Sequence, residues 1–322
     1  MLRRDILAAA PLGVLAAISG GCGQSSTGAG SARETPASQA AAGQQGNGRK
    51  LAAFGLQLST ITPLLMADFE GTLEKVAAIG YRQVEFSALG FLGRPVERVV
   101  ELLAANNLSA PVGRISPKLP DDFATMKREQ QMAAFRTYSG PDHLLDNVRH
   151  GLQACQVLDQ KHLVLPALMP DNFSSLAAVE QSIALLQQAG ELCAAAGVQF
   201  GYHNHDWEFK AVDGVIPYDL MLERIEPELM TGQLDVYWVT KGGRDPLQYL
   251  QSFSGRFPSC HLKDMSETGD FEDVGHGTID FPQFTAAAMA AGTAYYFVER
   301  DNPPQPMTTA RRAYAFLEQM TF

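Results

Sequence analysis

The chain has 322 residues, of which 46% are hydrophobic and 19% charged, and its formal net charge is −10. An acidic chain without a basic run lacks the groups that neutralise phosphates, which argues against nucleic-acid binding. A chain of this length can bury a large core without disulfides. No CxxC pair is present, and we expect Cys155, Cys193 and Cys260 to be small buried hydrophobic residues, with a structural disulfide as the alternative.

Residues 1–22 have the features of an export signal: two adjacent arginines, resembling a twin-arginine signal, precede a short apolar stretch. Cys22 follows small residues and is a candidate for lipid attachment, but Ser19 stands where an aliphatic residue is usual, so a plain cleavage site is the alternative. Residues 23–49 are rich in Gly, Ala, Ser and Gln and predict a flexible linker. We therefore expect a protein that is exported to the periplasm or lipid-anchored at the cell envelope, with 50–322 as its folded domain.

From Leu51 onward, short apolar runs alternate with longer amphipathic stretches. Strands are predicted at 51–60, 83–89, 109–115, 162–167, 199–205, 232–239, 258–265 and 294–301. Helices are predicted at 68–80, 95–106, 141–159, 174–196, 217–225, 245–254, 281–291 and 308–320. Eight such pairs predict a single α/β domain, a (β/α)8 TIM barrel.

The alternative to a barrel is an open, doubly wound sheet. That fold requires a glycine-rich turn after the first strand. The sequence there, 59–63, is STITP and contains no glycine, which argues against the open sheet. The segment 116–141 is polar and rich in proline, and it predicts a long loop over the active-site face of the barrel.

Polar side chains gather where the predicted strands end, and in a barrel these positions point into the site. They are Glu85, His203, His205, Asp235, His261, Lys263 and Glu299. Taken singly, each has a structural explanation, such as a helix cap for Asp235 or a surface cation for Lys263. Four successive strands that end in His, Asp, His and Glu instead predict one divalent metal ion, since nitrogen and carboxylate donors without thiolate suit Mn²⁺, Co²⁺, Mg²⁺, Fe²⁺ or Zn²⁺. A glycosidase pair of Glu85 and Glu299 would leave the histidines unexplained.

Nearly the whole chain after the leader resembles the xylose-isomerase-like barrel family, also called the sugar phosphate isomerase/epimerase family. The segments that carry the resemblance are GLQL (55–58), FEGTL (69–73), GYRQVEF (80–86), HNHDWEF (203–209), LDVYWV (234–239), HLKDM (261–265) and GHGTIDF (275–281). The resemblance implies a metal held by the residues at four strand ends, here His203, Asp235, His261 and Glu299. The family usually has glutamate where this chain has His203, so His205 stays open as an alternative ligand.

The resemblance also implies an isomerase or epimerase that forms an enediolate on a keto sugar. His205 or Glu299 is the candidate base, Lys263 can neutralise an oxyanion, and Glu85 is a further catalytic candidate. Epimerases of the family use two glutamates as acid and base, and this chain has His203 in place of one of them.

Substrate contacts are predicted for Trp207, Trp238 and His276, with a small sugar as the binding partner. Two alternatives remain for the function. One is a metal-dependent lyase or hydrolase that opens 3-keto-glycosides by β-elimination, which an exported location favours. The other is a sugar-binding barrel without catalytic activity. The sequence does not predict the oligomeric state.

Overall fold

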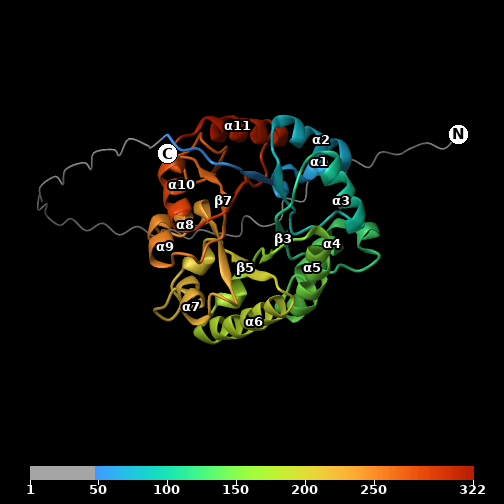
Figure 1. Cartoon of the computed structure of the whole chain (residues 1–322). Coiled ribbons are helices and arrows are strands. Elements are labelled where there is room, and N and C mark those ends of the chain that lie inside the picture. The colour runs from blue at the N-terminus through green and yellow to red at the C-terminus, as the bar shows by residue number, and fades with distance from the viewer. Residues whose placement is uncertain (1–47) are drawn as a thin grey trace, which may run out of the picture.

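Eight parallel strands form the inner wall of a barrel in the computed structural model, which describes residues 48–322 (Figure 1). They are β1 (Gly55–Gln57), β2 (Gln83–Glu85), β3 (Val112–Arg114), β4 (His162–Leu165), β5 (Gln199–His203), β6 (Thr231–Asp235), β7 (Ser259–Leu262) and β10 (Tyr295–Val298). The order around the wall is β2-β1-β10-β7-β6-β5-β4-β3, and a bridge between Gln83 and Ser109 joins β2 to the segment just before β3. The predicted TIM barrel is confirmed, with a weak seam between β2 and β3.

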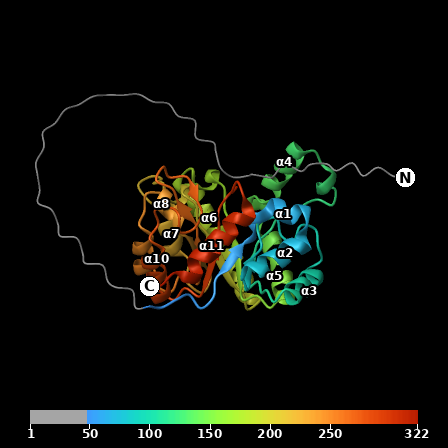
Figure 2. The ribbon, with the colours of Figure 1, turned by 90° about the horizontal axis from the view of Figure 1, so that it is seen from above.

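Helices surround this wall (Figures 1 and 2). They are α1 (Thr62–Ala67), α2 (Phe69–Ile79), α3 (Val96–Ala105), α4 (Arg128–Tyr138), α5 (Leu144–Leu158), α6 (Leu176–Ala195), α7 (Pro217–Arg224), α8 (Val236–Lys241), α9 (Pro246–Ser252), α10 (Phe281–Ala290) and α11 (Pro306–Gln319). A short antiparallel pair, β8 (Asp264–Met265) and β9 (Phe271–Glu272), follows β7. None of the helices within 48–322 has both the length and the apolar character needed to span a bilayer.

Side-chain caps explain where several helices begin. Asp68 accepts a hydrogen bond from the Gly71 N–H at 3.0 Å at the start of α2, and Asp245 accepts one from Leu247 at 2.8 Å at the start of α9. Such caps satisfy backbone donors that have no partner inside the helix. Gly292 follows α10 with a φ of +94°, a left-handed conformation that glycine adopts without strain.

The core has two parts. A small cluster of Val112, Val164 and Phe297 groups strand residues with each other, and a much larger cluster joins strands and helices. The packing is tight, since a Cβ added at Gly55 would lie 2.6 Å from the Phe297 ring. The three cysteines within the described residues are free and buried, as predicted, with no disulfide among them.

The expected strand 51–60 contains β1 and then a turn of 3-10 helix, Leu58–Ile61, and two further predicted elements are wrong. The expected strand 232–239 ends at Asp235, because its carboxylate accepts the Trp238 N–H and begins helix α8 there. The expected loop 116–141 contains α4, which has no buried residue and therefore gave a weak core-facing pattern. The export signal 1–22, Cys22 and all but the last two residues of the linker 23–49 lie outside the described residues.

Candidate metal centre and active-site cavity

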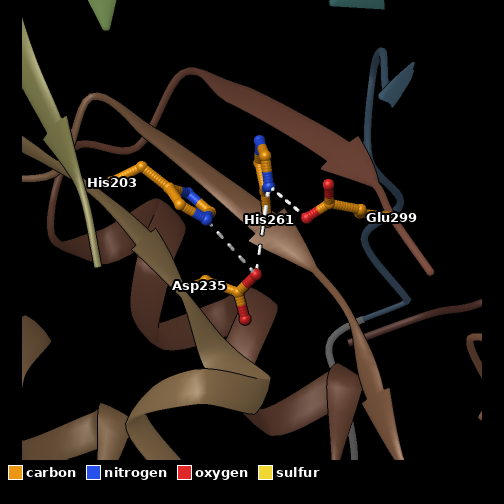
Figure 3. A group of neighbouring side chains, drawn as sticks. All are labelled: His203, Asp235, His261 and Glu299. Carbon is orange, nitrogen blue, oxygen red and sulfur yellow. Dashed lines mark hydrogen bonds and ion pairs between the residues drawn. The ribbon is translucent and has the colours of Figure 1, made fainter. Parts of the chain in front are cut away.

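Four buried side chains converge at the C-terminal end of the barrel (Figure 3). His203 ends β5, Asp235 ends β6, His261 lies on β7, and Glu299 directly follows β10. Each offers one donor atom, and these four atoms all lie within 4.8 Å of one another. The parallel register, which sets Asp235 beside His261, brings these strand ends to one place.

The four donor atoms surround a common point. The Asp235 Oδ2 atom lies 3.9 Å from His203 Nε2 and 3.9 Å from His261 Nδ1, and His261 Nδ1 lies 2.8 Å from Glu299 Oε2. Asp235 Oδ2 is buried without a hydrogen-bond partner, whereas Oδ1 is engaged by the Trp238 N–H at 3.0 Å. A buried carboxylate oxygen without a partner is costly, and a cation at this point would satisfy it. These residues therefore fit a divalent ion bound by nitrogen and oxygen.

A second layer of side chains orients His261. Its Nε2 atom lies 2.8 Å from Glu85 Oε2. Glu85 is fully buried and also accepts hydrogen bonds from Gln233 Nε2 at 2.6 Å and from Arg114 at 3.2 Å. The imidazole is thus fixed with Nδ1 turned toward Asp235 and Glu299, as in carboxylate–histidine–metal arrangements.

The charges in this group are set by burial and by close partners. Burial raises the pKa of Asp235 to about 7 and lowers that of His203 well below its usual range. Burial alone would raise the pKa of Glu299, but Lys263 and His261 hold it well below its usual range. Burial opposes protonation of His261, but Glu299 and Glu85 raise its pKa to about 9. A neutral His203 and an ionised Glu299 are the forms that bind cations, while a cation would take the place of the proton on His261.

A cavity of about 290 Å³ opens in front of this group, and His203 and Glu299 form part of its wall. Lys263 also lines it; its Nζ lies 2.8 Å from Asp301 Oδ2 and 3.1 Å from Glu299 Oε2. Nearby carboxylates more than offset the effect of burial and raise the pKa of Lys263, so it stays an ammonium ion. The cavity therefore carries the fixed positive charge of Lys263 beside the candidate metal position.

His205 lines the same cavity but is not one of the four grouped donors. Its ring stacks on Trp207 at 4.3 Å with an interplanar angle of 7°. Its Nδ1 is buried without a partner, and burial, followed by the charge of Lys263, lowers its pKa well below the usual range. A neutral imidazole with an unused nitrogen can accept a proton.

The remaining predicted residues lie farther from the cavity. Glu85 is absent from its lining, as are Trp207, which stacks behind His205, and Trp238, whose ring lies 5.1 Å from Lys263 Nζ. His276 is exposed in the loop after β9 and does not line the cavity either. The roles assigned to these residues stay predictions.

The sequence analysis missed several polar residues of the wall, and Ser59 and Arg114 are two that contact the residues around the candidate metal position. The Ser59 hydroxyl donates to Glu299 Oε1 at 2.7 Å, and Arg114 donates to Gln233 Oε1 at 2.5 Å. Arg114 ends a strand and Ser59 lies just after one, so the strand-end rule would have found them had it been extended beyond histidines and acids.

Comparisons with known proteins identify relatives of this chain. Inosose dehydratase from Geobacillus kaustophilus (strain HTA426) is 25% identical over 157 residues, which are 42% of this chain and 50% of that protein. The chain thus spans about half the length of the curated relatives it matches.

Two solved structures share the fold. A sugar phosphate isomerase/epimerase from Parabacteroides distasonis ATCC 8503 matches with a TM-score of 0.66 and 21% identity, over 82% of this chain and 92% of that one. The probable 3-DHS dehydratase AsbF from Bacillus anthracis matches with a TM-score of 0.61 and 11% identity, over 84% and 100%. The model of the xylose isomerase-like TIM barrel family matches residues 73–320. This chain therefore belongs to the xylose isomerase-like TIM barrel family.

Proposed function

We propose that this protein is a divalent-metal-dependent isomerase or epimerase that removes a proton next to the ketone of a sugar-like substrate. The observation that carries the proposal is the group of His203, Asp235, His261 and Glu299, whose donor atoms lie within 4.8 Å of one another beside a cavity. Convergent polar groups with perturbed pKa values in a cavity are typical of catalytic sites.

A divalent ion held by these residues would supply Lewis-acid stabilisation of the negative charge that develops on the ketone oxygen. His205 is the proposed base, because it is neutral, lines the cavity and has an unused nitrogen. The Lys263 ammonium lies at the same wall, where it stabilises an enediolate oxygen. Glu85 holds the His261 ring in place and is a positioning residue in this scheme. Return of the proton to the same or the neighbouring carbon completes epimerisation or isomerisation.

β-Elimination is the second candidate, and the names of two relatives, both dehydratases, favour it. His205 would take the proton from C2 of a 3-keto-glycoside, the electron pair would form the C1–C2 double bond, and the C1–oxygen bond would break. The leaving oxygen departs with its electron pair and takes up a proton to become an alcohol. The presence of His203 in place of a second carboxylate also suits a reaction with one base.

A sugar-binding protein without activity is the rival from another class. Incubation of metal-loaded protein with keto sugars and 3-keto-glycosides in D2O, followed by NMR, separates the three candidates. Deuterium uptake with retained substituents supports isomerisation or epimerisation, and release of the aglycone supports elimination. Absence of both, together with loss of metal on dialysis, would leave only the binding function.

The location is also a proposal. The leader 1–22 and the linker 23–49 suit an exported protein, periplasmic or held at the envelope through a lipid on Cys22. Mass spectrometry of the mature N-terminus from the native host tests this directly.

A further inference from the structure

The cavity beside the metal group has a second half that is apolar. Its wall there is formed by Leu89, Pro117, Phe123, Met132, Phe135 and Leu144. Most of these residues belong to the segment 116–143 between β3 and α5, which contains α4. A polar sugar ring gains little from contact with an apolar wall, so this half of the cavity suits a different, apolar part of the ligand.

Helix α4 does not serve the core. None of its residues is buried, and it projects beyond the rest of the barrel (Figure 2). Its apolar side chains Met132 and Phe135 nevertheless turn to the cavity, where both are only partly buried. Apolar groups that face a cavity rather than a core become fully covered when an apolar ligand enters.

The segment is fixed over the cavity at both ends. Asn147, on α5, is 3% exposed; its Oδ1 accepts the Lys118 N–H at 2.9 Å, and its Nδ2 donates to the Tyr138 carbonyl at 2.7 Å. Asn147 itself lines the cavity. The apolar wall is therefore a built part of the site rather than a loose loop lying near it.

The space available exceeds a single ring. A second cavity of about 590 Å³ adjoins the first and shares Leu89, Arg114, Pro117 and Phe123 with it. This second cavity also borders β3, beside the weak seam between β2 and β3. A substituent that enters the apolar half thus has room to extend into the second cavity.

The cations of the first cavity do not offer a phosphate site. Lys263 is bound to Asp301 and Glu299, and Arg114 is bound to Glu85 and Gln233. No other lysine or arginine lines this cavity within residues 48–322. A phosphate group needs several uncommitted donors, and the one Lys263 N–H left after these two contacts is assigned to the enediolate oxygen.

We propose that the segment 116–143 forms a subsite for an apolar substituent, so that the substrate is an alkyl or aryl glycoside rather than a free or phosphorylated sugar. The proposal rests on the proposed function, since it assumes that the sugar-like half lies at the metal group. It places the substituent against Phe123, Met132 and Phe135.

Calorimetric titration of the metal-loaded protein with phenyl and methyl β-D-glucosides tests the subsite. Neither ligand carries a ketone, so binding is measured without turnover. The phenyl glucoside should bind about 10-fold more tightly or better, the order of effect that filling a hydrophobic pocket produces. The double variant Met132→Ala/Phe135→Ala should lose this preference. The matched control Arg136→Ala, exposed on the same helix, should keep it.

Equal affinity of the two glucosides, no binding of either, or a preference that survives in the double variant would overturn the proposal. Tighter binding of glucose 6-phosphate than of the phenyl glucoside would overturn it as well. Circular dichroism confirms that the variants are folded. Deuterium exchange into 3-keto-glucosides is read separately. Exchange at equal rates for the methyl and phenyl forms would support the proposed function and reject the subsite. Tighter binding of the phenyl glucoside without any exchange would support the subsite and reject the proposed function.

Discussion

Replacement of His205 separates the base from the metal ligands. The imidazole lines the cavity, stacks on Trp207 at 4.3 Å and lies outside the group of four donors. His205→Ala should therefore leave metal content at the wild-type level. Loss of a general base lowers the rate about 10²–10⁴-fold, equivalent to roughly 3–5 kcal/mol of transition-state stabilisation.

The assay pairs two measurements on the same preparation: metal per chain by plasma mass spectrometry and deuterium exchange by NMR. Trp207→Ala is the matched control, since it removes the stacking partner and leaves the imidazole. It should slow exchange far less than His205→Ala. Metal loss in His205→Ala would make this residue a ligand instead of His203, and an unchanged exchange rate would refute its role as the base.

Three further predictions follow from side chains around the site. Glu85→Gln should weaken metal affinity about 10–100-fold in a calorimetric titration, because His261 loses its carboxylate partner; unchanged affinity would contradict this role. Asn147→Ala should destabilise the 116–143 segment by about 1–3 kcal/mol and speed its cleavage in limited proteolysis, since two backbone groups lose their partner. Burial alone would raise the pKa of Asp273, but hydrogen bonds from Thr309 and Arg300 hold it below the usual range. The ionised carboxylate therefore stabilises the fold above about pH 4, and this contribution is lost as the pH falls through the lowered pKa. Asp273→Asn should therefore be less stable at neutral pH, and its free energy of unfolding, measured by urea titration, should fall less steeply as the pH is lowered below about 4. An unchanged dependence of this free energy on acid pH would refute the role of Asp273.

The sequence predicted the barrel and the strand-end residues well because both follow from local rules. Apolar runs separated by amphipathic stretches determine the order of strands and helices, and parallel strands bring their polar ends together. His203 and Glu299, far apart in the chain, meet for this reason.

The errors in the predicted elements arose where contacts with other parts of the fold determine the local structure. Asp235 both ends a strand and caps α8, and its apolar neighbours 236–239 continue a strand pattern although they form a helix. Helix α4 faces a cavity, so its apolar residues lack core periodicity. The place of Glu85 behind His261 depends on side chains of other strands, such as Gln233, which no local pattern reveals.

Metal titration of Asp235→Asn tests the central claim most directly. The amide oxygen can still accept the Trp238 N–H and cap α8, but the charged oxygen at the common point is gone. The control Asp280→Asn makes the same change at the cap of α10, away from the site. We predict one divalent ion per chain in the wild type and in Asp280→Asn, and none retained by Asp235→Asn. Equal metal binding by all three proteins, or by none, would contradict the account.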